Sequence, residues 1–171
     1  ASMRAKVLSN TEQPYIFFAG KSFSFKDAAF TKQMDEAEIA RAMRHVGLGI
    51  DQGGIGIGLL LDYLDDAVSD GELEALFTTA ADRRAPLFIH IRRGIAGDPS
   101  GLIEVIELAK RTGASIHICH LSASAMGGID NFLELVDEAL VAGVDISAES
   151  YPYNAGSTSI GADVFNRDWQ S

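Results

Sequence analysis

The chain has 171 residues, of which 47% are apolar, enough for one domain with a hydrophobic core and too many for a disordered chain. Its formal net charge of −10 argues against nucleic acid or an anionic membrane surface as partner, because both are bound through an excess of Lys and Arg. No apolar run reaches the roughly eighteen residues of a membrane helix, no secretory signal is recognisable, and the lone Cys119 excludes an internal disulfide. We therefore expect a cytoplasmic protein.

The first fifty residues carry few structural signals. The segment 35–46 has the periodicity of an amphipathic helix, and Ala5–Leu8 is compatible with a short strand. Residues 9–30 are rich in Phe and Lys and follow no clean period. The organisation of this N-terminal part is left open.

From residue 54 onward, a unit of one strand and one helix recurs. The apolar run 54–61 (GIGIGLLL) predicts a buried strand. Ser69 with Glu72 forms a capping box, which predicts a helix over 70–83, and 87–91 (LFIHI) predicts the next strand. We interpret the acidic residues of this region, in Asp62–Asp66 and Asp70–Glu74, as a solvated face and a helix start.

The unit repeats twice more along the chain. Asp98–Ser100 begins a helix that Gly113 ends, and a strand over 115–120 (SIHICH) follows. A helix over 129–142 and a strand over 144–148 (VDISA) complete the series.

Strands that alternate with helices about every thirty residues indicate parallel pairing through right-handed crossovers. A (β/α)8 barrel and an open doubly wound sheet both fit this α/β pattern. A barrel needs at least about 200 residues, and only four strands are clear here. As a barrel, the chain is a single partial domain over 1–171, about half of a (β/α)8 TIM-type barrel, with clear units from about 54 to 150.

Two histidines end predicted strands: His90 ends LFIH and His120 ends SIHICH. Adjacent strands lie about 4.8 Å apart, so both imidazoles could reach one metal ion, although structural histidines remain an alternative. Period-two alternation predicts that His117 and Cys119 face the helix layer instead, with Cys119 a small buried hydrophobic side chain. His45 lies near a helix C-terminus, where a partly charged imidazole suits the helix dipole.

Three motifs occur in a fixed order: HIR at 90–92, HICHLS at 117–122 and ESYPYNAGST at 149–158. Together they resemble the N-acyl-D-amino-acid deacylases (D-aminoacylases) of the amidohydrolase superfamily. The segment 47–63 is similar to the glycine-rich fourth barrel strand of that family, so the resemblance runs from about 47 to 165. It implies a (β/α)8 barrel with a small β-sandwich, and a metal-dependent hydrolase of amide C–N bonds. The substrate would be a small N-acyl amino acid or a related amide.

The resemblance also implies roles for individual residues. His90 and His120 match metal ligands of a site that holds one or two Zn2+ ions in the complete enzyme. Tyr153 matches a residue that contacts substrate, and Arg92, which lies beside the site, and Ser122 are further substrate-binding candidates. Ser122 stands where many family members have Lys, which affects the expected substrate preference.

The chain departs from the family pattern in several places. The H-x-H of the first barrel strand is absent, Cys119 is not at the position of the metal-binding cysteine, and the general-base aspartate would lie beyond Ser171. We therefore expect a partial chain that is inactive alone. Half a barrel exposes two sheet edges and an apolar face, so we expect a homo-oligomer.

Two other hypotheses remain open. One is a non-catalytic α/β module or oligomerising scaffold with structural histidines. The other is a nucleotide- or phosphate-binding open sheet that uses Gly53–Gly58 (GGIGIG). This run lacks the spacing of a phosphate-binding loop, so we interpret it as close packing in a strand or tight turn.

Overall fold

The computed structural model describes residues 2–8, 28–64, 67–92 and 97–158. Its helices are α1 (Ser2–Leu8), α2 (Ala28–Thr31), α3 (Glu36–Asp51), α4 (Leu61–Leu64), α5 (Asp70–Asp82), α6 (Ser100–Thr112), α7 (Leu121–Ala125) and α8 (Ile129–Val141), with a 3-10 turn η2 (Met126–Gly128) before α8. Its strands are β1 (Ile57–Leu60), β2 (Leu87–His90), β3 (Ile116–Ile118) and β4 (Ile146–Ala148). Every neighbouring pair of strands is parallel, in the order β1-β2-β3-β4, which confirms the predicted α/β class.

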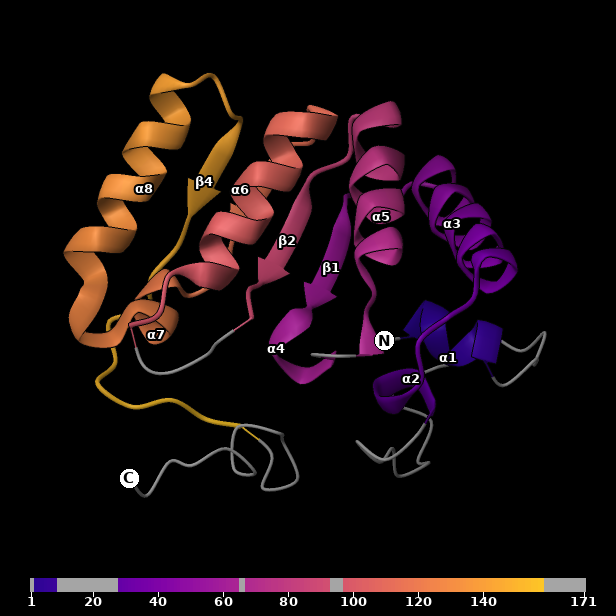
Figure 1. The fold of residues 1–171 in the computed structure, drawn as a ribbon, viewed down its shortest axis with the longest axis horizontal. Helices are drawn as coiled ribbons and strands as arrows, with labels where there is room; N and C mark the ends of the chain where they lie inside the picture. The colour runs from indigo at the N-terminus through magenta and orange to yellow at the C-terminus, as the bar shows by residue number, and fades with distance from the viewer. Residues whose placement is uncertain (1, 9–27, 65–66, 93–96, 159–171) are drawn as a thin grey trace.

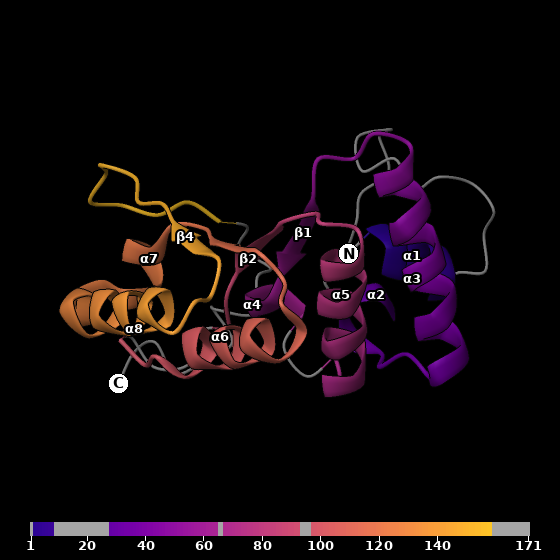
Figure 2. The same cartoon turned by 90° about the horizontal axis from the view of Figure 1, so that it is seen from above.

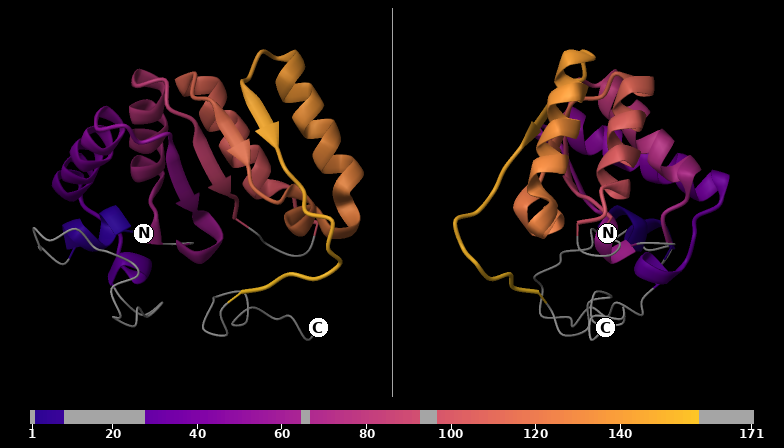
Figure 3. Two further views of the ribbon diagram at one scale, coloured as in Figure 1. Left: turned by 180° about the vertical axis from the view of Figure 1, so that it is seen from behind. Right: turned by 60° about the vertical axis from the view of Figure 1, so that its left-hand side comes forward.

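Helices α5, α6 and α8 lie side by side on one face of the sheet (Figures 1 and 2). Seen from behind, no described helix covers the strands (Figure 3). Alternate strand residues are buried with the helix residues Phe77, Val105 and Phe132 in one core; they are Ile57, Leu59, Leu87, Ile89, Ile116, Ile118 and Ile146. The residues between them form what we call the open face, which consists of Gly58, Leu60, Phe88, His117 and Ser147.

His117 lies on the open face, so its predicted position toward the helices is wrong. Its ring centroid is 5.6 Å from that of Phe88, and its Nδ1 is 2.9 Å from Ser147 Oγ. The reason is that the flanking isoleucines, Ile116 and Ile118, occupy the helix side of the same strand. Cys119, just past the strand, is half-buried, and this burial raises the pKa of its thiol.

The N-terminal region differs most from its prediction. Ala5–Leu8 belongs to helix α1 and not to a strand. The prediction was wrong because so short an apolar run fits either element. Val7 of α1 packs with Met34 and with Ala42 of α3. The ambiguous segment 9–30 falls outside the described residues except for the start of α2.

Helix α3 is longer than its periodic pattern indicated. Asp35 caps it, with reciprocal hydrogen bonds to Glu38, and the helix continues to Asp51 through two glycines. The strands are shorter than predicted, and Leu61 already begins α4. No helix in the described part of the chain is long and apolar enough to cross a membrane.

The glycines before β1 allow close backbone packing, as predicted. A Cβ on Gly54 would lie 2.7 Å from the carbonyl oxygen of Gly49, and one on Gly56 would lie 2.6 Å from that of Pro86. Backbone atoms cannot yield that space cheaply, so any side chain there would displace β1 from its neighbours.

The acidic stretch that begins α5 is not fully solvated, which corrects our interpretation. Glu72 is buried and forms an ion pair with Arg4 of α1. The Arg4 guanidinium also donates to the carbonyl oxygens of Ala29, Lys32 and Ala67. Desolvation raises the pKa of Glu72, and the hydrogen bond and charge of Arg4 oppose that rise.

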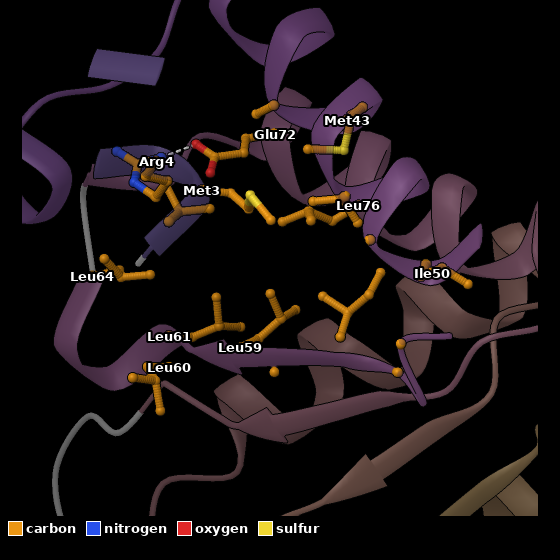
Figure 4. Close-up of a pocket in the computed structure, with 18 residues that line it drawn as sticks. Met3, Arg4, Met43, Ile50, Leu59, Leu60, Leu61, Leu64, Glu72 and Leu76 are labelled. Carbon is orange, nitrogen blue, oxygen red and sulfur yellow. Dashed lines mark hydrogen bonds and ion pairs between the residues drawn. The ribbon is translucent and has the colours of Figure 1, made fainter. Parts of the chain in front are cut away.

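The Arg4–Glu72 pair borders an apolar cavity of about 290 Å3 between α3 and β1. Figure 4 shows Leu59 and Leu61 on its floor and Met43 and Leu76 on the opposite wall. The ion pair thus joins α1 to α5 at the rim of a space that apolar contacts leave unfilled. The pair is therefore a buried polar attachment of the N-terminal helix.

Replacing Arg4 with Met should destabilise the fold by about 3–5 kcal/mol, because it leaves a buried carboxylate without its cation. The free energy of unfolding can be measured by urea titration. The exposed Arg44 of α3 provides the control, since Arg44→Met should change stability by no more than about 0.5 kcal/mol.

The deficit should also depend on pH. When the folded-state pKa of a carboxyl is raised, the protein gains stability as the pH falls through that pKa. Loss of Arg4 raises the pKa of Glu72 further. The Arg4→Met deficit should therefore be smaller at about pH 5 than at about pH 8. An equal deficit at both values would show that Glu72 is not its source.

Candidate functional site

Because the strands are parallel and in register, the residues at and just after the carboxyl ends of β1, β2 and β3 lie together at one end of the sheet, which we call its carboxyl edge. Leu60 pairs with His90, and Ile89 pairs with Ile118, two residues before His120. The rings of His90 and His120 meet edge to face, with centroids 4.3 Å apart and planes at 72°. The structure thus brings together the two histidines singled out in the sequence.

His90 is held by residues that follow β1. It is 9% exposed, and its Nε2 lies 3.3 Å from Oδ2 of Asp62. The ring of Tyr63 lies 5.1 Å from the His90 ring. Asp62 itself is 2% exposed, so the expectation that it belongs to a solvated face is wrong.

Asp62 is buried because α4 turns the chain directly beneath the end of β1. The rule that singled out His90 and His120, a polar residue at the carboxyl end of a parallel strand, applies equally to Asp62 and Tyr63. Sequence reasoning missed both because the neighbouring acidic residues suggested a solvated stretch.

His120 adopts a left-handed backbone conformation, with φ 40° and ψ 55°, at the start of α7. This conformation is uncommon outside glycine, and a strained residue of this kind costs on the order of 1–3 kcal/mol. The loop after β4 holds it in place. The His120 amide lies 3.4 Å from Glu149 Oε1, and the next amide, of Leu121, donates to the Glu149 carbonyl oxygen at 2.7 Å.

A segment after β4 forms the remaining wall of the site. It passes below the strand ends in the view of Figure 1, and the hydroxyl oxygens of Thr158 and Tyr63 lie 2.7 Å apart in a hydrogen bond. The ring centroid of Tyr151 lies 6.4 Å from that of His120, and Tyr153, two residues further along the chain, is 74% exposed. A cavity of about 480 Å3 lies between the strand ends and this segment; its lining includes Tyr63, His90, His120, Tyr151, Tyr153 and Thr158.

Two of the predicted substrate-binding residues do not line this cavity. Arg92 donates through Nε to Glu104 at 3.1 Å and through Nη2 to the Val68 carbonyl at 3.1 Å, beside the first turns of α5 and α6. Ser122 lies in α7, where its carbonyl oxygen accepts from the amide of Met126. Of the three predicted substrate residues, only Tyr153 is at the cavity.

The donor set suits zinc in kind, because imidazole nitrogens and carboxylate oxygens are its common protein ligands. His90 and His120 supply two imidazoles in contact. Within the described ranges, no three His, Cys, Asp or Glu residues are grouped closely enough to hold a metal ion. The described residues therefore fit part of a zinc site, since a catalytic zinc usually has three protein ligands.

Comparison with known proteins finds sequence similarity to a deacylase. The N-acyl-D-glutamate deacylase of Alcaligenes xylosoxydans xylosoxydans is 33% identical over 128 residues, which are 71% of this chain and 26% of the relative. No protein-family model matches the chain.

Solved structures agree with the sequence match. The N-acyl-D-glutamate deacylase of Bordetella bronchiseptica, complexed with zinc and a phosphonate that mimics the tetrahedral intermediate, superposes with a TM-score of 0.66 at 25% identity, over 75% of this chain and 27% of that one. A D-aminoacylase described as defining a novel subset of amidohydrolases superposes with a TM-score of 0.64 at 21% identity, over 74% and 27% of the two chains, and so shares the fold.

The parallel α/β fold of this chain, with two histidines at the carboxyl ends of its strands, is similar to part of the fold of these deacylases. The resemblance to the N-acyl-D-amino-acid deacylases is confirmed, and the chain is related to that family over about three quarters of its length. It spans about a quarter of the length of the relatives that it matches.

The Tyr63–Thr158 hydrogen bond should help to hold the segment after β4 against the site. Tyr63→Phe should increase hydrogen exchange in residues 149–158 by about 5–10-fold, which corresponds to one hydrogen bond of about 1 kcal/mol. Thr158→Val should act equally, and the double variant should add nothing to either single change. Additive effects of the two changes would mean that each hydroxyl acts through a different partner.

Proposed function

We propose that this chain carries the His90–His120 part of the zinc site of a metal-dependent N-acyl-D-amino-acid deacylase. The observation that carries the proposal is the contact of these two imidazoles at the carboxyl edge of a sheet related to zinc-bound N-acyl-D-glutamate deacylase. The complete site would hold one or two Zn2+ ions. The substrate would be a small N-acyl amino acid or related amide.

Zinc, when bound, lowers the pKa of a coordinated water and polarises the carbonyl of the scissile amide. His90 and His120 would bind it through neutral ring nitrogens. Tyr153 would contact substrate near the scissile carbonyl or near the carboxylate of the substrate. Arg92 and Ser122 would reach substrate only after rearrangement, because in this structure Arg92 is paired with Glu104 and Ser122 lies outside the cavity.

We further propose that residues 1–171 form one partial domain, about half of a (β/α)8 barrel, whose interior is the open face. The parallel order of the strands, the position of the described helices α5, α6 and α8 on one face, and the match to a D-aminoacylase fold support this geometry. We propose that the chain alone is inactive, because it spans about a quarter of the length of its relatives and its described residues supply only part of a zinc site. The lone Cys119 supports a reducing, cytoplasmic location.

The zinc site predicts metal content directly. Purified chain should bind about one zinc, and the His90→Ala/His120→Ala double variant should bind essentially none, as measured by elemental analysis. The matched control is His45→Ala/His117→Ala, which removes the other two histidines and should leave zinc content unchanged. Equal zinc in all three proteins, or none in any, would contradict the proposed site.

Hydrolysis tests the substrate class. A longer protein that contains this chain within a complete barrel should release free amino acid from N-acyl-D-amino acids, and the chain alone should release none. The double histidine variant of the longer protein should lose at least about 100-fold in kcat/KM. A zinc-loaded longer protein that is inactive across a broad N-acyl panel would exclude this substrate class.

The open face supports a homo-oligomer. Leu60 and Phe88 are exposed there beside the half-buried His117, and a second copy could cover this surface. Light scattering should give about twice the monomer mass, and Leu60→Ser/Phe88→Ser should shift the population to monomer. The control is Leu133→Ser, at an exposed leucine of α8. A wild-type chain that is monomeric at all concentrations would contradict this association.

A further inference from the structure

We propose that Asp62 is a positioning residue that holds His90 in one tautomer, with the proton on Nε2 and the lone pair on Nδ1. The inference rests on the proposed function only for its metal-binding consequence. The tautomer itself is a property of the zinc-free chain. The observations that carry it are the 3.3 Å separation of Asp62 Oδ2 from His90 Nε2 and the near-complete burial of both residues.

A buried carboxylate needs hydrogen-bond donors to replace the water that it has lost. An ionised carboxylate can only accept, so the Asp62–His90 contact is favourable when Nε2 carries the hydrogen. In a neutral imidazole, the other nitrogen then holds the only lone pair available to a metal. Asp62 thereby determines which edge of the His90 ring can serve as a ligand.

The packing around His90 supports a fixed ring. His120 meets it edge to face at 4.3 Å, and Tyr63, the residue next to Asp62, lies tilted at 5.1 Å. Rotation of the ring by a half turn about its Cβ–Cγ bond would direct Nδ1 and carbon atoms toward new neighbours and break the Asp62 contact. The two aromatic neighbours and the carboxylate together leave one favourable orientation.

Asp62 has a competing role as a direct metal ligand. Two donor atoms each about 2.0–2.1 Å from a tetrahedral zinc lie about 3.3 Å apart, so distance alone is compatible with an ion between Nε2 and Oδ2. A ligand role for Asp62 beside both histidines would require these three side chains to converge, and no three potential ligands converge within the described residues. In the positioning role, zinc binds Nδ1; in the ligand role, it binds Nε2.

Two-bond proton–nitrogen NMR correlation on the histidine rings distinguishes these roles. At about pH 8, where an ordinary imidazole is neutral, zinc-free chain should show His90 with Nε2 protonated, the signal being assigned by its absence in His90→Ala. Asp62→Ala should give a mixture of both tautomers. The control Asp137→Ala, at an exposed carboxylate of α8, should leave the His90 pattern unchanged.

Zinc affinity gives the second readout, by competition with a chelator. Asp62→Ala should weaken zinc binding by about 10–100-fold with unchanged stoichiometry, as expected for a residue that orients a ligand. Asp62→Asn retains the side-chain shape and an acceptor oxygen, so it should lose less and should keep the fold. In the zinc-loaded chain, the metal-bound nitrogen of His90 should be Nδ1, with Nε2 still protonated.

Three results would overturn the proposal: protonated Nδ1 in the zinc-free chain, a tautomer that Asp62→Ala leaves unchanged, or zinc bound to Nε2 in the loaded chain. Failure of the proposed function is distinguishable from these outcomes. If the wild-type chain binds no zinc, the deacylase-site proposal fails, and the zinc-free tautomer of wild type and Asp62→Ala still decides the role of Asp62.

Discussion

The in-phase pairing of four parallel strands is the constraint on which the site depends. Ile57 pairs with Leu87, Leu87 with Ile116, and Ile116 with Ile146, so residues about thirty positions apart lie at the same height in the sheet. The groups that follow each strand therefore meet at one edge. A shift of one residue in any pair would turn the helix-facing side chains of that strand toward the open face and separate the histidines, so core packing and site geometry are fixed by the same hydrogen bonds.

The two buried carboxylates among the described residues show how the partner determines what a buried charge can do. Glu72 faces Arg4, whose guanidinium presents only N–H donors, so the pair joins two helices. Asp62 faces His90, whose ring can be neutral and can place its hydrogen on either nitrogen. The same side-chain chemistry is therefore structural at the start of α5 and able to direct a ligand at the end of β1.

The repeating strand-and-helix order and the positions of His90 and His120 could be predicted because both depend on local periodicity and on where strands end. The burial of Asp62 and Glu72 could not, since it depends on partners 28 and 68 residues away. An acidic run looks solvated until such a partner is known. The N-terminal helix was missed for a related reason: its apolar residues are too few to show a period, and their packing against α3 decides the conformation.

Each histidine of the site is contacted by the loop of a neighbouring strand. The residues after β1 hold His90, through Asp62 and Tyr63, and the residues after β4 hold His120, through Glu149. The left-handed backbone of His120 is strained and needs such support. Glu149 provides it by contacting the His120 amide and accepting from the amide that follows. Strands β2 and β3 carry the two imidazoles, and β1 and β4 orient them. The four-stranded unit therefore holds both rings from its two outer strands: loss of β1 with its loop would remove the contacts of Asp62 and Tyr63 with His90, and loss of β4 with its loop would remove those of Glu149 with the backbone at His120.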